Sequence, residues 1–257
     1  MALIKINEML RLFRWTSAVF SVAAIAACSH YGAAVEKALR HAGDNRPELE
    51  KVLEHYRQDP ADSLKYRAAE YLIRYMPYHT SYPAKPYYAY CDALDSLFSS
   101  ATEGDELLEK TNAIAAGFGR QLKLSYDIRV IGADYLIWNI DYSFGLWRTL
   151  NYLRHLRFEE FCEYVLPYKC AEKQPLDTWK RDWRDYGRGE LDHIGQIRDY
   201  KYNARRAAEA VNFQFQDSVK MRRVKDAKLI EVLRLNTLAK QPYGDCRDRS
   251  RFGLLNC

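Results

Sequence analysis

The residues best suited to carry out a reaction lie near the C-terminus, in the stretch Gly244-Asp245-Cys246-Arg247-Asp248-Arg249-Ser250. A proline and a glycine end the preceding apolar run, and Asp245 is a helix-capping residue type, so Cys246 is expected at the first helical position. Unpaired N–H groups at a helix N-terminus favour the thiolate, and two nearby arginines add positive charge. The pattern therefore predicts an activated cysteine nucleophile.

This Gly-Asp-Cys turn resembles the one that opens the nucleophile helix in bacterial transglutaminase-like (papain-like) proteins. Residues 42–53 and 133–141 are also similar to the non-catalytic N-terminal region of Bacteroidetes lipoproteins of that family. The resemblance covers nearly the whole mature chain. It implies that Cys246 attacks an acyl carbon in acyl transfer or amide hydrolysis, that a histidine accepts its proton and that an aspartate orients the histidine. It implies no cofactor.

The rest of that triad is not found where the family places it. In the family the histidine and aspartate follow the cysteine, whereas here eleven residues follow Cys246 and none of them is a histidine. All six histidines precede it, and His193 is the nearest. We therefore expect an N-terminal portion of a transglutaminase-like protein, with an incomplete triad, that is inactive alone.

The first 27 residues have the pattern of a secretory signal. Positive residues precede a nearly uncharged run from Thr16 to Ala27, which is shorter than the ~20 residues that span a bilayer. It ends in Ile25-Ala26-Ala27-Cys28, which resembles a bacterial lipobox. We expect cleavage before Cys28, lipidation of its thiol, and an exported protein anchored to the cell envelope, at the outer membrane.

Charge and cysteine usage exclude some classes of function. The formal charge of +5 falls to +3 without the leader, which holds three cations and one anion, and the cations are mixed with many acidic residues. This is no nucleic-acid signature. The chain has no CxxC or HExxH motif, so a metal site has no support. Cys162 and Cys170 could form a disulfide in an exported protein, but buried free thiols are the more common alternative.

The elements that would position these residues are mainly helical. The segments with 3.6-residue periodicity or helix boundary signals are Tyr31–His41, Asp44–Asp59, Asp62–Met76, Tyr87–Ser99, Asp105–Gly117, Ala133–Leu150, Phe158–Leu166, Pro175–Asp199, Tyr202–Phe213 and Lys228–Leu238. Residues 77–86 are expected to form a loop rich in aromatic residues, in which a ligand platform and an ordinary loop both fit. Residues 122–131 fit either a short strand or an extended link. The helix over Ala133–Leu150 is apolar almost all round and is therefore expected at the centre, with Trp138 and Trp147 in the core.

These patterns predict a mainly α protein with three regions. Residues 1–27 would be the signal peptide, residues 28–214 a helical N-terminal domain, and residues 215–257 the start of a papain-like α+β core. Two functions compete: the thiol enzyme, and a non-catalytic surface lipoprotein whose helical body binds a protein or glycan partner. In both, the lipid on Cys28 would attach the protein to a membrane.

Overall fold

The computed structural model describes residues 31–100 and 102–182, together with residues 206, 209, 220–221 and 243–244. Cys28, His193 and Cys246 lie outside the described residues, as do most of the region after residue 182. Two short strands are described in that region: β3 (Lys220–Met221) pairs in parallel with β4 (Tyr243–Gly244). The sequence favours a turn over residues 241–244, before Cys246, but Tyr243 and Gly244 form strand β4, so this expectation was wrong for these two residues.

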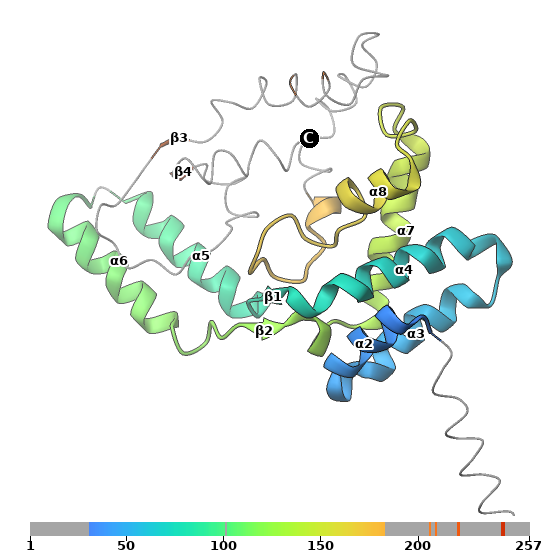
Figure 1. The fold of residues 1–257 in the computed structure, drawn as a ribbon. Coiled ribbons are helices and arrows are strands. Elements are labelled where there is room, and N and C mark those ends of the chain that lie inside the picture. The colour runs from blue at the N-terminus through green and yellow to red at the C-terminus, as the bar shows by residue number, and fades with distance from the viewer. Residues whose placement is uncertain are drawn as a thin grey trace, which may run out of the picture.

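Most of the described residues are helical, as the periodicity predicted. A bundle forms from five helices, α2 (Ala33–His41), α3 (Arg46–Arg57), α4 (Ser63–Tyr75), α7 (Ala133–Thr149) and α8 (Phe158–Tyr164) (Figure 1). Short 3-10 turns join or follow them: η2 (Gly43–Asn45), η3 (Pro60–Asp62), η4 (Met76–Tyr78) and η5 (Asp127–Arg129).

Local sequence explains where these helices begin and end. Gly43 adopts a left-handed φ of 57°, which ends α2 at little steric cost. Pro47 lies in the first turn of α3, where no N–H bond is lost. Pro77 follows α4, and the chain then turns through η4. Arg157 begins α8 by donating its backbone N–H to the Glu160 carboxylate at 2.8 Å.

The bundle core is continuous and apolar. Leu39, Leu49, Leu53, Ile73 and Ile140 are fully buried in one cluster. Each such side chain stabilises the fold by about 1.5–3 kcal/mol relative to an exposed position. Helix α7 packs on both α3 and α4 through one face, which holds Leu136, Ile140 and Phe144, whereas the residues on its other face are partly or fully exposed; it therefore lies at the side of the bundle and not at its centre as expected.

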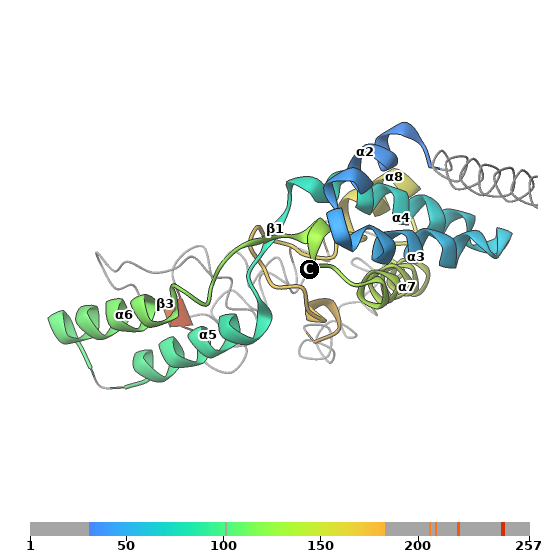
Figure 2. The same cartoon turned by 90° about the horizontal axis from the view of Figure 1, so that it is seen from below.

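A second, smaller unit projects from the bundle. Helices α5 (Ala84–Phe98) and α6 (Gly104–Phe118) form an antiparallel hairpin with its own cluster of buried residues, which includes Tyr87, Tyr90 and Leu94. Figure 2 shows the hairpin and the bundle at opposite ends of the described structure. Residues 84–86, expected in a loop, begin α5 instead. Pro86 is tolerated there because the first-turn N–H groups of a helix have no partner within the helix.

A narrow neck joins the hairpin to the bundle. Strand β1 (Thr80–Ser81) pairs antiparallel with β2 (Ser125–Tyr126), and Ser81 also bridges to Lys173. Residues 122–131 thus contain a short strand, as one of the two alternatives predicted, and the 3-10 turn η5, which neither alternative included, follows it directly.

Candidate functional site

The residues that the sequence marked for chemistry are not brought together within the described structure. Cys246 and Cys28 lie outside it, so the predicted helix N-terminus at Cys246 stays a prediction. Neither Cys162 nor Cys170 forms a disulfide, so the possible bond between them was wrong; the alternative of buried thiols holds for Cys162, whereas Cys170 is exposed. Burial raises the pKa of the Cys162 thiol to about 12, which makes this cysteine a poor nucleophile near neutral pH.

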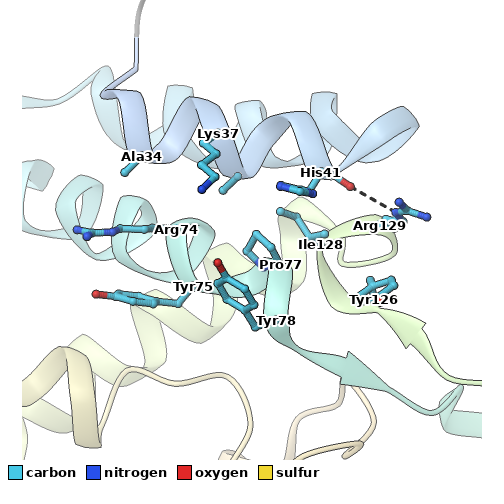
Figure 3. A pocket seen from close by; sticks show the side chains of 11 residues that line it. Ala34, Lys37, His41, Arg74, Tyr75, Pro77, Tyr78, Tyr126, Ile128 and Arg129 are labelled. Atoms are coloured by element: carbon cyan, nitrogen blue, oxygen red, sulfur yellow. Dashed lines mark hydrogen bonds between the residues drawn. The ribbon is translucent and has the colours of Figure 1, made fainter.

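The feature that stands out instead is an open cavity between the bundle and the neck, with a volume of about 740 Å³. That volume lies within the range of about 300–1,000 Å³ usual for ligand sites. Its walls come from three parts of the chain that are distant in sequence: α2, the end of α4 with η4, and β2 with η5 (Figure 3).

Helix α2 supplies one wall through a single face. Ala34, Lys37, Ala38 and His41 line the cavity, at spacings of three and four residues that place them on one side of a helix. The opposite side of α2 carries Val35 and Leu39, which are buried in the bundle core. The helix is therefore fixed by its apolar side and presents Lys37 and His41 to the cavity.

The cavity is lined by cationic side chains and by no acidic one. Lys37, Arg74 and Arg129 line it together with His41, and none of the eleven lining residues is Asp or Glu. None of the ion pairs found within the described residues involves any of these three cations. Cations that line one concave surface without carboxylate partners among the described residues create a positive potential there, which favours an anionic group.

Three tyrosines add flat surface to this positive cavity. Tyr75, Tyr78 and Tyr126 are 44%, 78% and 52% exposed, which is unusual for large aromatic side chains. Arg74 lies 5.3 Å from the ring centroid of Tyr75, and Arg129 lies 5.6 Å from that of Tyr126. The arginines are thus held against rings at the cavity wall, where both can contact a ligand.

A buried ionic cluster in the neck holds one wall in place. Asp127, fully buried between Tyr126 and Ile128, accepts hydrogen bonds from Ser81 Oγ at 2.5 Å and from Tyr168 Oη at 2.9 Å. Lys169 Nζ lies 2.6 Å from the same carboxylate and donates to the Thr80 carbonyl at 2.8 Å. Burial, and then the negative charge of Asp127, raise the pKa of Tyr168 well above its ordinary value, so this phenol remains a donor.

Two further contacts fix η5 against the end of α2. Asn45 Nδ2 donates to the carbonyls of Ile128 and Ile131 at 3.0 and 2.9 Å. Arg129 Nε lies 3.4 Å from the His41 carbonyl at the C-terminal end of α2, where helix carbonyls attract cations. The cavity is therefore largely formed before any ligand binds, since its distant walls are joined by hydrogen bonds.

The aromatic loop expected at residues 77–86 takes part in this site through two residues, Pro77 and Tyr78. Tyr78 lines the cavity, whereas Ser81 and Tyr82 are buried. His79 Nδ1 lies 3.7 Å from Glu172 outside the cavity lining. Trp138, expected in the core, is partly exposed and stacks between Tyr135 and Tyr142, while Trp147 packs against the bundle core.

Other kinds of site find no support in the part of the chain that the structure describes. No group of three or more His, Cys, Asp or Glu is arranged there to hold a metal ion. None of the helices among the described residues is both long and apolar enough to span a membrane.

Comparison with known proteins gives no family or relative. The chain matches no family model, and neither the curated proteins nor the solved structures yield a significant match. The transglutaminase-like resemblance thus rests on the residues quoted above, and the function is argued from the cavity.

Proposed function

We propose that this chain is an exported, lipid-anchored surface protein whose helical body binds an anionic group of a protein or glycan partner in the cavity between α2, α4 and η5. The single observation that carries this proposal is that Lys37, Arg74 and Arg129 line, together with three exposed tyrosines, a cavity lined by no acidic residue. A charge-assisted hydrogen bond contributes about 1.5–3 kcal/mol. Two such bonds give about 3–6 kcal/mol, less than the roughly 8.2 kcal/mol of a micromolar Kd, so ring contacts must add to them.

The first experiment measures binding of anionic probes to the mature protein. Oligogalacturonate and a short polyglutamate peptide serve as glycan and peptide probes. Lys37→Glu should weaken the binding of both probes by tenfold or more, and the affinity of the wild-type protein for each probe should fall with added salt. Lys123→Glu is the matched control, because Lys123 is exposed and does not line the cavity. Equal binding by the Lys37 and Lys123 variants would refute the proposed site.

A second variant separates ring contact from charge. Tyr78→Ala should weaken oligogalacturonate binding about three- to tenfold, because aromatic contacts contribute about 1 kcal/mol. Tyr164→Ala is the matched control, since Tyr164 is 75% exposed and lies outside the cavity lining. Both variants should unfold at the wild-type temperature, because neither ring is buried.

The second candidate function is thiol chemistry at Cys246, favoured by the Gly-Asp-Cys motif. In this proposal residues 215–257 begin a papain-like core and the thiol attacks acyl carbons, with the proton acceptor outside the described residues. Iodoacetamide labelling across pH should modify Cys246 at lower pH than Cys91 and Cys162, both of which are buried. Turnover of glutamine-containing peptides that Cys246→Ala abolishes would establish the enzyme, and equal labelling of all three thiols would remove the activated cysteine.

The anchor has its own test. Cys28→Ala should move the expressed protein from the detergent phase to the aqueous phase on Triton X-114 partition, because the proposed lipid is attached to that thiol. Unchanged partition would count against lipidation, and the variant would leave the cavity intact for the binding assays.

A further inference from the structure

The cationic cavity has a neighbour of opposite character. A second cavity of about 550 Å³ shares Ala34, Arg74 and Tyr75 with the first. Its lining also includes three carboxylates, Glu70, Glu159 and Glu163, with Arg67 as its only other cation. The two cavities therefore adjoin, and the charge of their walls changes sign between them.

The order of lining residues shows how the two cavities are arranged. Along α2, residues from Gly32 to Val35 line the second cavity, and residues from Ala34 to His41 line the first. Along α4 the same order holds, from Arg67 to Tyr75 and then from Arg74 onward. The two cavities thus follow one another along both helices. We call this combined surface the α2–α4 groove.

The acidic side chains of the groove are available at its surface. Glu163 accepts a hydrogen bond from Tyr71 Oη at 2.8 Å, which orients its carboxylate beside the groove. Glu159 is 71% exposed and lies 3.9 Å from Arg67, at the edge of ion-pair distance. Glu159 and Glu163 come from α8 and Glu70 comes from α4, whereas the cations of the first cavity come from α2, α4 and η5, so the charges that α8 adds to the groove are all acidic.

We infer that the α2–α4 groove binds an extended peptide segment in which an acidic residue and a basic residue are separated by about three others. From Arg67 to Pro77 the α4 axis rises about 15 Å at 1.5 Å per residue, and an extended peptide covers this distance in about five residues at 3.3 Å each. A polyuronate glycan supplies the negative charge but no cation for the second cavity. This inference rests on the proposed function and names its partner class.

The test uses fluorescently labelled peptides with one composition and different charge order. A block peptide carries two glutamates, three serine or glycine residues and two lysines. Its reverse has the opposite chain direction, and its isomer alternates glutamate with lysine. One of the two block peptides should bind the mature protein at least tenfold more tightly than the alternating isomer, because only a block order satisfies both charge groups at once.

A charge-reversal pair then assigns the second cavity. Glu159→Lys combined with Glu163→Lys should weaken binding of the block peptide at least tenfold. Oligogalacturonate should bind this double variant as tightly as the wild type or more tightly. Glu106→Lys combined with Glu109→Lys is the matched control, since both glutamates are exposed on α6 and line neither cavity. Circular dichroism should show the same helix content for both double variants.

The outcomes separate this inference from the function on which it rests. If block and alternating peptides bind equally, or if the α8 reversal changes nothing while Lys37→Glu still weakens oligogalacturonate, the inference is wrong and the anion-binding site stands. If Lys37→Glu changes the binding of neither probe, both are wrong.

Discussion

Asp177 offers a test of the junction between the hairpin and the bundle. Its carboxylate accepts hydrogen bonds from Tyr88 Oη of α5 and from its near neighbour Trp179 N, the latter at 3.1 Å, while its carbonyl accepts from Tyr135 Oη of α7 at 2.9 Å. Burial raises the pKa of Asp177 from 3.8 to about 7, and the charge of Asp182 adds to this. No cation balances the carboxylate among these contacts, so its ionisation opposes the fold.

The sign and size follow from proton linkage. Because the pKa is higher in the folded than in the unfolded chain, the stability associated with the protonated carboxyl is fully present below about pH 4 and is lost as pH rises through 7. Each pH step within that interval changes the free energy of unfolding by up to 1.36 kcal/mol. We expect Asp177→Asn, which cannot ionise, to gain about 2–3 kcal/mol relative to the wild type between pH 5 and pH 8.

The assay is urea unfolding of both proteins at pH 5, 6, 7 and 8, monitored by tryptophan fluorescence. The difference in unfolding free energy should rise between pH 5 and pH 7 and then level off. Asp134→Asn, at an exposed position in the first turn of α7, controls for the introduction of an amide. A difference between wild type and Asp177→Asn that does not change with pH would show that the carboxyl is ionised throughout, and the reasoning from burial would be refuted.

Three further substitutions test the framework of the site. Lys169→Met should lower the free energy of unfolding by about 3–5 kcal/mol, because it leaves the buried Asp127 carboxylate without its cation. Adding Asp127→Asn should restore part of that free energy, as measured by urea unfolding. Asn45→Ala should lower the free energy of unfolding by about 1–3 kcal/mol and weaken oligogalacturonate binding, because the carbonyls of Ile128 and Ile131 lose their donor. Unchanged binding would show that the cavity wall at η5 does not need this contact. Phe144→Ala should cost about 3–5 kcal/mol in the same unfolding assay, since its ring is buried against Phe161, and a cost under 1 kcal/mol would contradict the packing.

The helices of the bundle could be predicted from sequence because each signal is local. The apolar stripe of α3 and the proline in its first turn lie within twelve residues, and the glycine that ends α2 follows within two residues of its last turn. Pro86 misled the interpretation of α5, because a proline in the first helical turn and a proline in a loop look alike when the partner helix is unknown.

The cavity could not be predicted in the same way. The face of α2 that carries Lys37 and His41 is visible as a spacing, but nothing nearby in sequence indicates that Arg129 closes the opposite wall, 88 residues after His41. The local sequence around Asp127 suggests an exposed side chain, since a charged residue between tyrosine and isoleucine is usually taken as exposed. Asp127 is buried because Lys169 and Tyr168, about forty residues later, supply its partners.

The proposed anchor and the α2–α4 groove constrain each other. Four residues separate Cys28 from Ala33, the first residue of α2, and five fully extended Cα steps cover at most about 18 Å. A lipid on Cys28 would therefore keep the N-terminal end of α2, which lines the acidic cavity, within that distance of the membrane surface. An anchored protein samples partners on the same surface at a high effective concentration, so a weak site suffices. A shallow groove with a few exposed charges fits that regime better than it fits capture of a free solute, for which the whole affinity must come from the contacts themselves.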